Sequence, residues 1–404
     1  MSAIELTYED CKRILAQERL PRAFVNLDAF DSNARKMFSI LEGTGKTMRI
    51  ASKSLRCADL LGRAFELGGA AAKGVMSFTV EEAYFLVRRG FDDILVAYPT
   101  ARAKDFEILC ALAARGADVS VVCDSEENAR ALSEAGRAAG VVIQLVVEVD
   151  MSLRPAGGAA HLGVRRSTVR TGADALRVAR AAEKAGGAAV IGIMGYEAQI
   201  AGMADENPFS RALNPARKLI REMSKPDVKR RRESVVSFLR KNGVNLRIVN
   251  GGGTGSLDFT SRDDSCTETT AGSGFYCPHL FSYYSNLALT PAAFFALQAS
   301  RFPARRMVAC NGGGYVASGE AGEDRLPLPW LPKGARLTKL EGAGEVQTPV
   351  EIPAGVSLSP GDPVIFRHAK AGELTERFNE LLLISDKTAV GSVPTYRGEG
   401  FCFL

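Results

Sequence analysis

The chain has 404 residues, of which 46% are hydrophobic and 24% are charged, and its formal net charge is +5. These values are typical of a globular protein and exclude an intrinsically disordered chain or a fibrous repeat. The apolar runs are too short to span a membrane. The first residues, MSAIELTYEDCKR, lack a basic stretch followed by an apolar one, so we expect a cytoplasmic protein without membrane contact.

From residue 23 onward, short apolar runs alternate with longer segments of helical periodicity. This alternation predicts parallel strands joined by helices, and therefore an α/β fold with a closed (β/α)₈ TIM-type barrel. An open doubly wound sheet would give the same pattern. The eight expected strands cover 23–29, 48–54, 74–78, 93–99, 118–124, 143–150, 189–197 and 247–253.

Two regions depart from this alternation. The interval 203–243 contains two helix-like pieces broken around Pro226, which we interpret as a helical insertion over one barrel face. Its basic run KRRRE (229–233) indicates a solvated helix face rather than a nucleic-acid contact. After about residue 285 the sequence becomes turn-rich and β-prone. We therefore predict a barrel domain at 1–290 and a mainly β domain at 291–404.

Candidate functional residues stand where the predicted strands end, because catalytic groups of such barrels gather at the carboxyl ends of the strands. These residues are Lys53, Asp150 with the nearby Arg154, Tyr196, and the run NGGGTGS at 250–256. The glycine run exposes backbone N–H groups and is able to bind a phosphate, although it matches no nucleotide-binding motif and is also compatible with a simple turn.

A lysine beside a phosphate site has a specific chemical use. Its amine forms a Schiff base with an aldehyde that carries a phosphate, and pyridoxal 5′-phosphate is such a molecule. Lys53 is therefore the predicted covalent attachment point. The alternative without a catalytic role is that a lysine at a strand end is a solvated or ion-paired side chain.

Several segments in order resemble the alanine-racemase-like, fold type III pyridoxal-phosphate enzymes. These are AFVNLDAFDSNA, RIASKSLR, EVDMSLR, GIMGYEAQIAG, NGGGTGS and ETTAGSGFY. Within that group the chain looks most like the D-threonine aldolase and D-serine dehydratase branch, in the subgroup called amino acid deaminase/aldolase.

The resemblance implies a role for each matching residue. Lys53 would carry the cofactor, and Arg154 would approach the pyridoxal ring or its phenolic oxygen. Tyr196 and the later pair Ser273 and Gly274 would surround the phosphate together with Gly252, Gly253 and Thr254.

The chain departs from the branch at two places. Ala51 and Leu55 occupy positions where the branch has histidines around its lysine. In the small domain the branch has HxD or HxC as metal ligands, whereas this chain has His368 followed by Lys370. An ammonium group is not an ordinary metal ligand. We therefore predict no metal, a positive charge from Lys370 in its place, and an acid–base role for His368.

Other assignments around this segment stay open. A shifted metal site using Glu373 with His368 is an alternative to the metal-free interpretation. His161 and His279 could border the site. The alternative without a catalytic role for His368 is a buried structural histidine.

The predicted function is that of a pyridoxal-phosphate-dependent lyase acting on a β-hydroxy-α-amino acid of D configuration. Retro-aldol cleavage would give glycine and an aldehyde, and dehydration would give a keto acid and ammonia. An amino-acid racemase and a non-catalytic pyridoxal-phosphate carrier are the alternatives. We expect a homodimer. Its substrate would be a small amino acid, and we expect no nucleic acid to bind.

Overall fold

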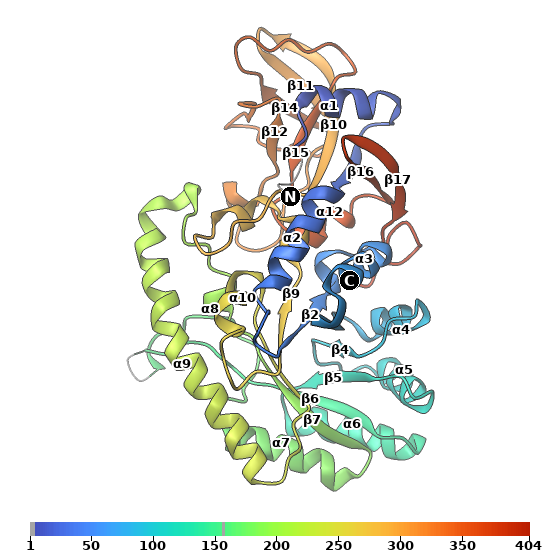
Figure 1. Ribbon diagram of the computed structural model, residues 1–404, viewed down its shortest axis with the longest axis vertical. Coiled ribbons are helices and arrows are strands. Elements are labelled where there is room, and N and C mark those ends of the chain that lie inside the picture. The colour runs from blue at the N-terminus through green and yellow to red at the C-terminus, as the bar shows by residue number, and fades with distance from the viewer. Residues whose placement is uncertain (1–4, 156–157) are drawn as a thin grey trace.

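The computed structural model describes residues 5–155 and 158–404. It contains a closed barrel of eight parallel strands and a separate nine-stranded sheet (Figure 1). The barrel forms the lower half of the view and the second sheet forms the upper half. This arrangement confirms the predicted TIM-type barrel with a mainly β second part and excludes the open doubly wound sheet. The boundary near residue 290 stays a prediction.

The barrel consists of β2 to β9, each hydrogen-bonded to the next, with β9 closing the ring against β2. Helices between the strands cover the outside (Figure 1). The strands are β2 (Thr47–Ala51), β3 (Ala72–Ser77), β4 (Ile94–Val96), β5 (Val119–Cys123), β6 (Ile143–Glu148), β7 (Ala188–Gly195), β8 (Ile248–Gly251) and β9 (Glu268–Ala271). The intervening helices include α3 (Ala58–Gly68), α4 (Val80–Arg88), α5 (Ala103–Ala114), α6 (Glu126–Ala139) and α7 (Gly172–Ala185).

The membership of the barrel differs from the prediction at one strand. The run expected at 23–29 forms β1 (Arg22–Asn26), which pairs antiparallel with β10 (Ala293–Ala304) and parallel with β16 (Glu380–Ser385) in the second sheet. The strand that completes the barrel is β9, which the sequence analysis missed. Because β1 is buried on both faces, its apolar pattern resembles that of a barrel strand.

The second sheet has the strand order β13-β14-β11-β10-β1-β16-β17, with β15 pairing β10 and β12. Its other strands are β11 (Met307–Asn311), β12 (Leu328–Leu331), β13 (Arg336–Leu337), β14 (Gln347–Glu351), β15 (Pro363–Arg367) and β17 (Thr388–Pro394). The N-terminal helix α1 (Tyr8–Ile14) contacts β15, and α2 (Leu27–Ser39) runs from this sheet toward the barrel (Figure 1). A short helix, α12 (Ala371–Thr375), packs against the turn that carries Lys53.

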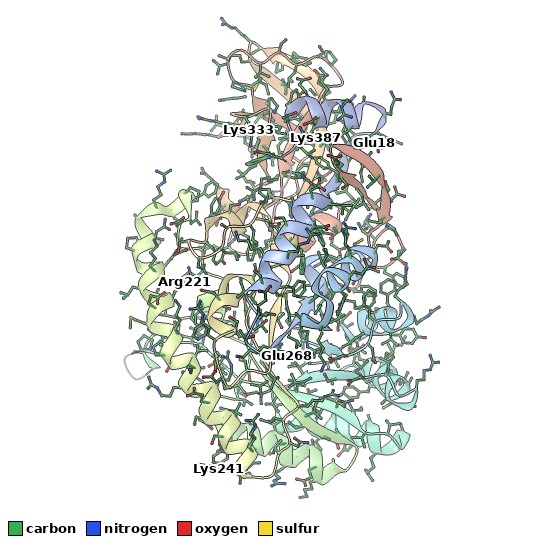
Figure 2. All side chains as sticks on the ribbon, in the orientation of Figure 1. Glu18, Arg221, Lys241, Glu268, Lys333 and Lys387 are labelled. Carbon is green, nitrogen blue, oxygen red and sulfur yellow. The ribbon has the colours of Figure 1, made fainter. Side chains whose placement is uncertain are left out.

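The predicted insertion is a single helix, α9 (Asn214–Lys241), preceded by a 3-10 segment at Pro208–Leu213. Pro226 lies inside α9 and does not divide it, so the predicted break is wrong. Packing of α9 against α7 and the short α8 (Ala198–Ala201) stabilises the helix despite the proline. Figure 2 shows Arg221 and Lys241 at different levels of this helix.

The sequence had indicated a solvated face for the basic run on α9. In the structure this run is only partly solvated. Arg232 is fully buried and forms ion pairs with Glu197 and Asp263, while Arg231 pairs with Asp227. A buried guanidinium requires such partners, because an unpaired charge in the interior is strongly disfavoured. Two of its arginines are therefore held by carboxylates of the same chain.

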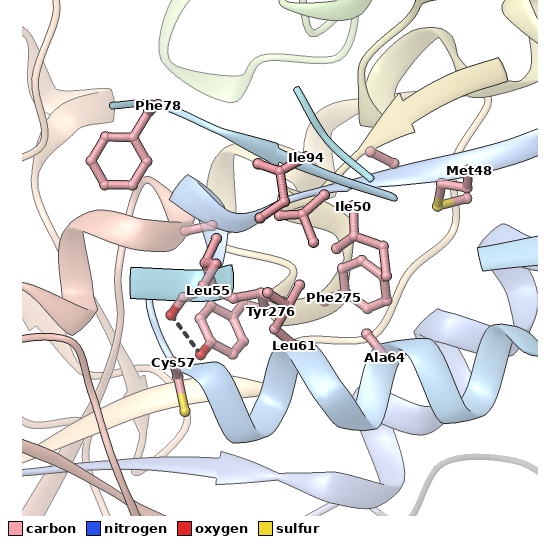
Figure 3. Close-up of a cluster of buried hydrophobic side chains, with 14 of the residues drawn as sticks. Met48, Ile50, Leu55, Cys57, Leu61, Ala64, Phe78, Ile94, Phe275 and Tyr276 are labelled. Atoms are coloured by element: carbon pink, nitrogen blue, oxygen red, sulfur yellow. Dashed lines mark hydrogen bonds between the residues drawn. The ribbon is translucent and has the colours of Figure 1, made fainter. Parts of the chain in front are cut away.

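A continuous apolar core supports the turn that follows β2 (Figure 3). Leu55 and Cys57 are fully buried beside Phe275 and Tyr276, and the Tyr276 hydroxyl donates to the Leu55 carbonyl at 3.0 Å. Burial of such side chains contributes roughly 1.5–3 kcal/mol each. Within the described residues, no helix combines the length and apolarity that a membrane crossing requires.

Candidate active site

A cavity of about 170 Å³ opens at the carboxyl ends of the barrel strands. Lys53 lies at one side of it, and the glycine run of β8 lies at another. Its lining includes the residues used below: Lys53, Ser54, Tyr98, Arg166, Tyr196, Gly252, Gly253, Thr254, Gly272 and Ser273. The structure thus brings together most of the residues that the sequence had indicated, and it adds Tyr98 and Arg166.

Lys53 is the central residue of a 3-10 turn, Ser52–Ser54, that begins directly after β2. Backbone N–H groups of Leu55 and Arg56 donate to the Ser52 carbonyl at 2.9 and 2.8 Å and close the turn. The exposed ammonium of Lys53 lies 3.1 Å from the Tyr98 hydroxyl. Among the described residues, Lys53 has no carboxylate partner in ion-pair range, so its amine is not occupied by a salt bridge.

Arg166 lies between two aromatic rings of the cavity. Its guanidinium carbon is 5.7 Å from the Tyr98 ring centroid and 5.4 Å from that of Tyr196. Burial raises the pKa of Tyr98, but the cations of Lys53 and Arg166 outweigh burial and hold that pKa below its usual range. Tyr196 differs, because burial raises its pKa despite Arg166. The two phenols therefore have opposite tendencies to ionise.

The glycine side of the cavity is a cradle of hydroxyl and backbone groups. The Thr254 hydroxyl accepts the N–H groups of Gly272 and Gly274 at 3.3 and 3.2 Å, which joins the loops after β8 and β9. The Ser54 and Ser273 hydroxyls are 3.3 Å apart at the junction with the Lys53 turn. A Cβ at Gly272 would lie 2.7 Å from the Ser54 hydroxyl oxygen, so this close approach requires glycine.

A buried ionic network holds the glycine run from below. Glu197 accepts the N–H of Gly252 at 2.9 Å and the Thr260 hydroxyl at 2.5 Å. Arg232 donates to Glu197 at 3.1 Å and to the Gly195 carbonyl at 3.0 Å. Gly252 has φ +94°, a conformation that favours glycine. The sequence analysis did not identify Glu197 or Arg232, although a glutamate directly after Tyr196 at a strand end was a signal for the former.

Three other predicted residues, Asp150, Arg154 and Gly274, lie apart from the cavity lining. Arg154 donates to Asp150 at 2.7 Å and to the Ser152 hydroxyl at 3.2 Å, and Arg170 also pairs with Asp150. Arg166 is the arginine that reaches the cavity. It lies in the loop between β6 and α7, where the sequence carries no strand-end signal. Gly274 supports the cradle through Thr254 without lining the cavity.

The histidines also lie outside this lining. His368 is 2% exposed, and neither ring nitrogen has a hydrogen-bond partner within the described residues. Burial, together with the charge of Arg367, lowers the pKa of His368 to about 3. His279 is buried with a pKa lowered to about 4, mainly by burial, and His161 bonds to the Val164 carbonyl oxygen at 3.1 Å. This placement does not favour the predicted acid–base role of His368.

Lys370 is half-buried and directly precedes α12, the helix that packs against the Lys53 turn. Its ammonium donates to the Ser318 hydroxyl at 3.0 Å, and that hydroxyl donates to Glu373 at 2.5 Å. Burial lowers the pKa of Lys370, and the charges of Arg325 and Lys53 lower it further, against the opposing effect of Glu373. Lys370 and Lys53 are thus electrostatically coupled. No group of three or more potential metal ligands occurs in the described ranges.

The donor set of the cavity fits pyridoxal 5′-phosphate. The Lys53 amine, which forms no salt bridge with any described residue, suits the aldehyde, and the hydroxyls of Ser54, Thr254 and Ser273 with the adjacent glycine backbone suit a phosphate. The Arg166 guanidinium is available to a further anionic group. These residues would hold the cofactor between the ends of β2, β8 and β9.

The fold and the cavity define a class: (β/α)₈ barrels with a lysine-centred site and a second β domain packed at the barrel mouth. The family model described as alanine racemase, N-terminal domain, matches residues 25–274. The chain therefore belongs to this family, whose members depend on pyridoxal phosphate.

Two curated relatives are similar over part of the chain. A 3-hydroxy-D-aspartate aldolase of Paracoccus denitrificans is 28% identical over 253 residues, which are 63% of this chain and 59% of the relative. A D-threonine aldolase of an Arthrobacter species is 26% identical over 259 residues, 64% of this chain and 61% of the relative. The match thus spans about three fifths of these relatives.

Solved structures show the same fold over nearly the whole chain. The D-threonine aldolase from Filomicrobium marinum has a TM-score of 0.78 at 21% identity, covering 95% of this chain and 97% of that one. The D-threo-3-hydroxyaspartate dehydratase from a Delftia species has a TM-score of 0.75 at 19% identity, covering 95% and 98%. The likeness therefore includes the second, mainly β part.

Proposed function

We propose that this chain is a pyridoxal-phosphate-dependent lyase acting on a β-hydroxy-α-amino acid of D configuration. The observation that carries the proposal is the cavity itself, in which the Lys53 amine has no carboxylate partner among the described residues and lies beside a cradle of hydroxyl and glycine groups. The curated relatives are aldolases of 3-hydroxy-D-aspartate and D-threonine, which supports this choice of substrate.

Each part of the site has a distinct task in this proposal. Bound pyridoxal phosphate supplies an electron sink when a bond to the substrate Cα breaks. Lys53 is the nucleophile, and it holds a proton at its nitrogen once substrate has displaced it. The cradle of Thr254 and Ser273 binds the phosphate, and Arg166 binds a carboxylate. Tyr196 lines the cavity and limits the access of water to it.

The test supplies the holoenzyme with the D and L isomers of threonine and of 3-hydroxyaspartate. We expect glycine with an aldehyde, or ammonia with a keto acid, from D isomers only, and loss of turnover by several orders of magnitude in Lys53→Ala. The same variant should lose the imine absorbance that borohydride removes. Formation of the opposite enantiomer without either product pair would identify a racemase, and an imine without any conversion would identify a carrier.

We also propose that the reaction needs no divalent metal. The segment that resembles a metal site holds Lys370 two residues after His368, and a dication there would meet an ammonium, which is a costly like-charge contact. Activity should therefore persist after exhaustive chelation. Activity that is lost to the chelator and restored by one ion would refute this, and elemental analysis of the untreated protein provides an independent check.

We infer, finally, that the protein is a cytoplasmic homodimer. Relatives of this fold often complete their sites across a dimer interface, which supports the inference. Sedimentation equilibrium at micromolar concentration should give twice the chain mass of 43.2 kDa. A monomer that retains full activity would contradict it.

A further inference from the structure

Among the described residues, the Lys53 amine has one hydrogen-bond partner. Lys53 Nζ lies 3.1 Å from the Tyr98 hydroxyl, which is within hydrogen-bond distance. Tyr98 follows β4, two strands from Lys53 around the barrel, so two rigid elements fix this distance. A phenol at this place touches the atom that must lose and regain protons.

The charges around Tyr98 favour a proton that moves between phenol and amine. Lys53 and Arg166 are the cations near its ring, at 5.7 Å each. Glu148 on β6 is the nearby acid, and burial raises the pKa of its carboxyl to about 7, against the effect of Arg166. Tyr196 on the far side of Arg166 is partly buried, and burial raises its pKa. Of the two phenols beside Arg166, Tyr98 is thus the one that its surroundings help to ionise.

We propose that Tyr98 is a catalytic acid–base residue that exchanges one proton with Lys53. The inference rests on the proposed function only in taking Lys53 as the nucleophile. The pair has two states. In one, the Lys53 ammonium faces a Tyr98 phenolate, and in the other, a neutral Lys53 amine faces a Tyr98 phenol. The two states differ only in the position of that proton. The pair therefore presents a neutral, nucleophilic amine without releasing a proton to water.

The covalent step balances with Tyr98 as the carrier. When the Lys53 nitrogen bonds to an aldehyde carbon, two protons leave the nitrogen and two reach the aldehyde oxygen, which departs as water. For each of the two protons, the Tyr98 phenol donates one to the oxygen and then takes one from the nitrogen, so the phenol ends as it began. The reverse sequence releases the lysine.

The first experiment measures how quickly apoprotein forms an imine with free pyridoxal 5′-phosphate, by stopped-flow absorbance over a range of pH. Tyr98→Phe should slow this reaction about 100-fold near neutral pH, in line with the usual contribution of a positioned acid–base group. Tyr84→Phe is the matched control, because Arg88 lies over its ring at 5.9 Å but no lysine in the described part of the chain is hydrogen-bonded to its hydroxyl. It should react like the wild type. An equal rate in Tyr98→Phe would overturn the proposal.

The second experiment follows phenolate absorbance of the apoprotein during a pH titration, and it holds even where Tyr98→Phe folds poorly. In the wild type one tyrosine should ionise before the others, and in Lys53→Met that early step should move to higher pH because the adjacent cation is gone. An unchanged titration in Lys53→Met would overturn the proposal. If imine formation depends on Tyr98 but no amino acid is converted, the proposed lyase function fails and this inference stands.

Discussion

Glu82 on α4 lies beneath the Lys53 turn and is fully buried. Its carboxylate accepts the Phe78 N–H at 2.7 Å and the Tyr396 hydroxyl at 2.9 Å. Burial nevertheless raises the pKa of Glu82 from 4.5 to about 7, since these bonds only partly replace hydration. A carboxyl that binds its proton more tightly in the folded chain makes stability depend on pH.

We predict that the free energy of unfolding falls as pH rises from 4.5 to about 7, the window between the unfolded and folded pKa of Glu82. The stabilising contribution is complete below this window and is lost above it. Glu82→Gln, which cannot ionise, should remove this component, worth about 3 kcal/mol as an order of magnitude. Urea unfolding of both proteins at several pH values measures it. Parallel pH dependences in the two proteins would contradict the assignment.

Part of the site was predictable residue by residue, and part was not. Lys53 and the glycine run stand at strand ends, where the topology of a barrel places functional groups. Tyr98 also ends a predicted strand, so the same rule could have found it. Arg166 could not be found this way, because a long loop brings it to the cavity. The burial of His368 depends on packing of the second sheet, which local sequence does not specify.

At the scale of elements, β1 and β9 show why the strand assignment failed in one place. β1 is apolar and buried on both faces, which is equally typical of a barrel strand. β9 has the polar sequence Glu-Thr-Thr-Ala. Its Glu268 is accommodated inside the barrel because it pairs with Arg49 at 2.6 Å. An internal ion pair replaces the apolar pattern by which strands are recognised.

Helix α9 yields a prediction from its internal proline. Pro226 is exposed, and it removes one backbone hydrogen bond from the middle of the helix. Pro226→Ala should therefore stabilise the protein, by up to about 3 kcal/mol on the scale of helix propensities. Denaturant unfolding measures the gain. A loss of stability would show that the proline bends α9 into a shape that its contacts require.

Helix α12 yields a second prediction. A Cβ at Gly372 would overlap the carbonyl oxygen of Lys53, so the second sheet and the catalytic turn meet at this glycine. Gly372→Ala should displace the turn and strongly reduce imine formation with pyridoxal phosphate. Gly62→Ala on α3 is the control, since its Cβ would meet open space, and it should be neutral or stabilising by about 0.5–1 kcal/mol. Full imine formation in Gly372→Ala would show that the contact relaxes elsewhere.

For the whole molecule, the contacts between the two parts are numerous and specific. α12 packs on the Lys53 turn, Arg56 of that turn pairs with Glu376, and the N–H of Tyr396 donates to the Arg56 carbonyl at 2.9 Å. We therefore predict one cooperative thermal transition. Calorimetry should give equal calorimetric and van't Hoff enthalpies. Two resolved transitions would mean that the barrel and the second sheet unfold independently.

The position of β1 has a consequence for how the chain is made. Val25 of β1 pairs with Leu383 of β16. β1 is synthesised early, and it cannot form this pairing until β16 is synthesised near the end of the chain. At about 5–20 residues per second, roughly 18–72 s of translation separate them. Until β10 is made, Ala23, Phe24 and Val25 form an extended apolar segment with no strand beside it, which is the kind of peptide that chaperones bind, and its second edge stays open until β16 follows. Ribosome-bound chains that end before β10 should be cleaved by protease near residue 24, whereas released full-length chains should resist.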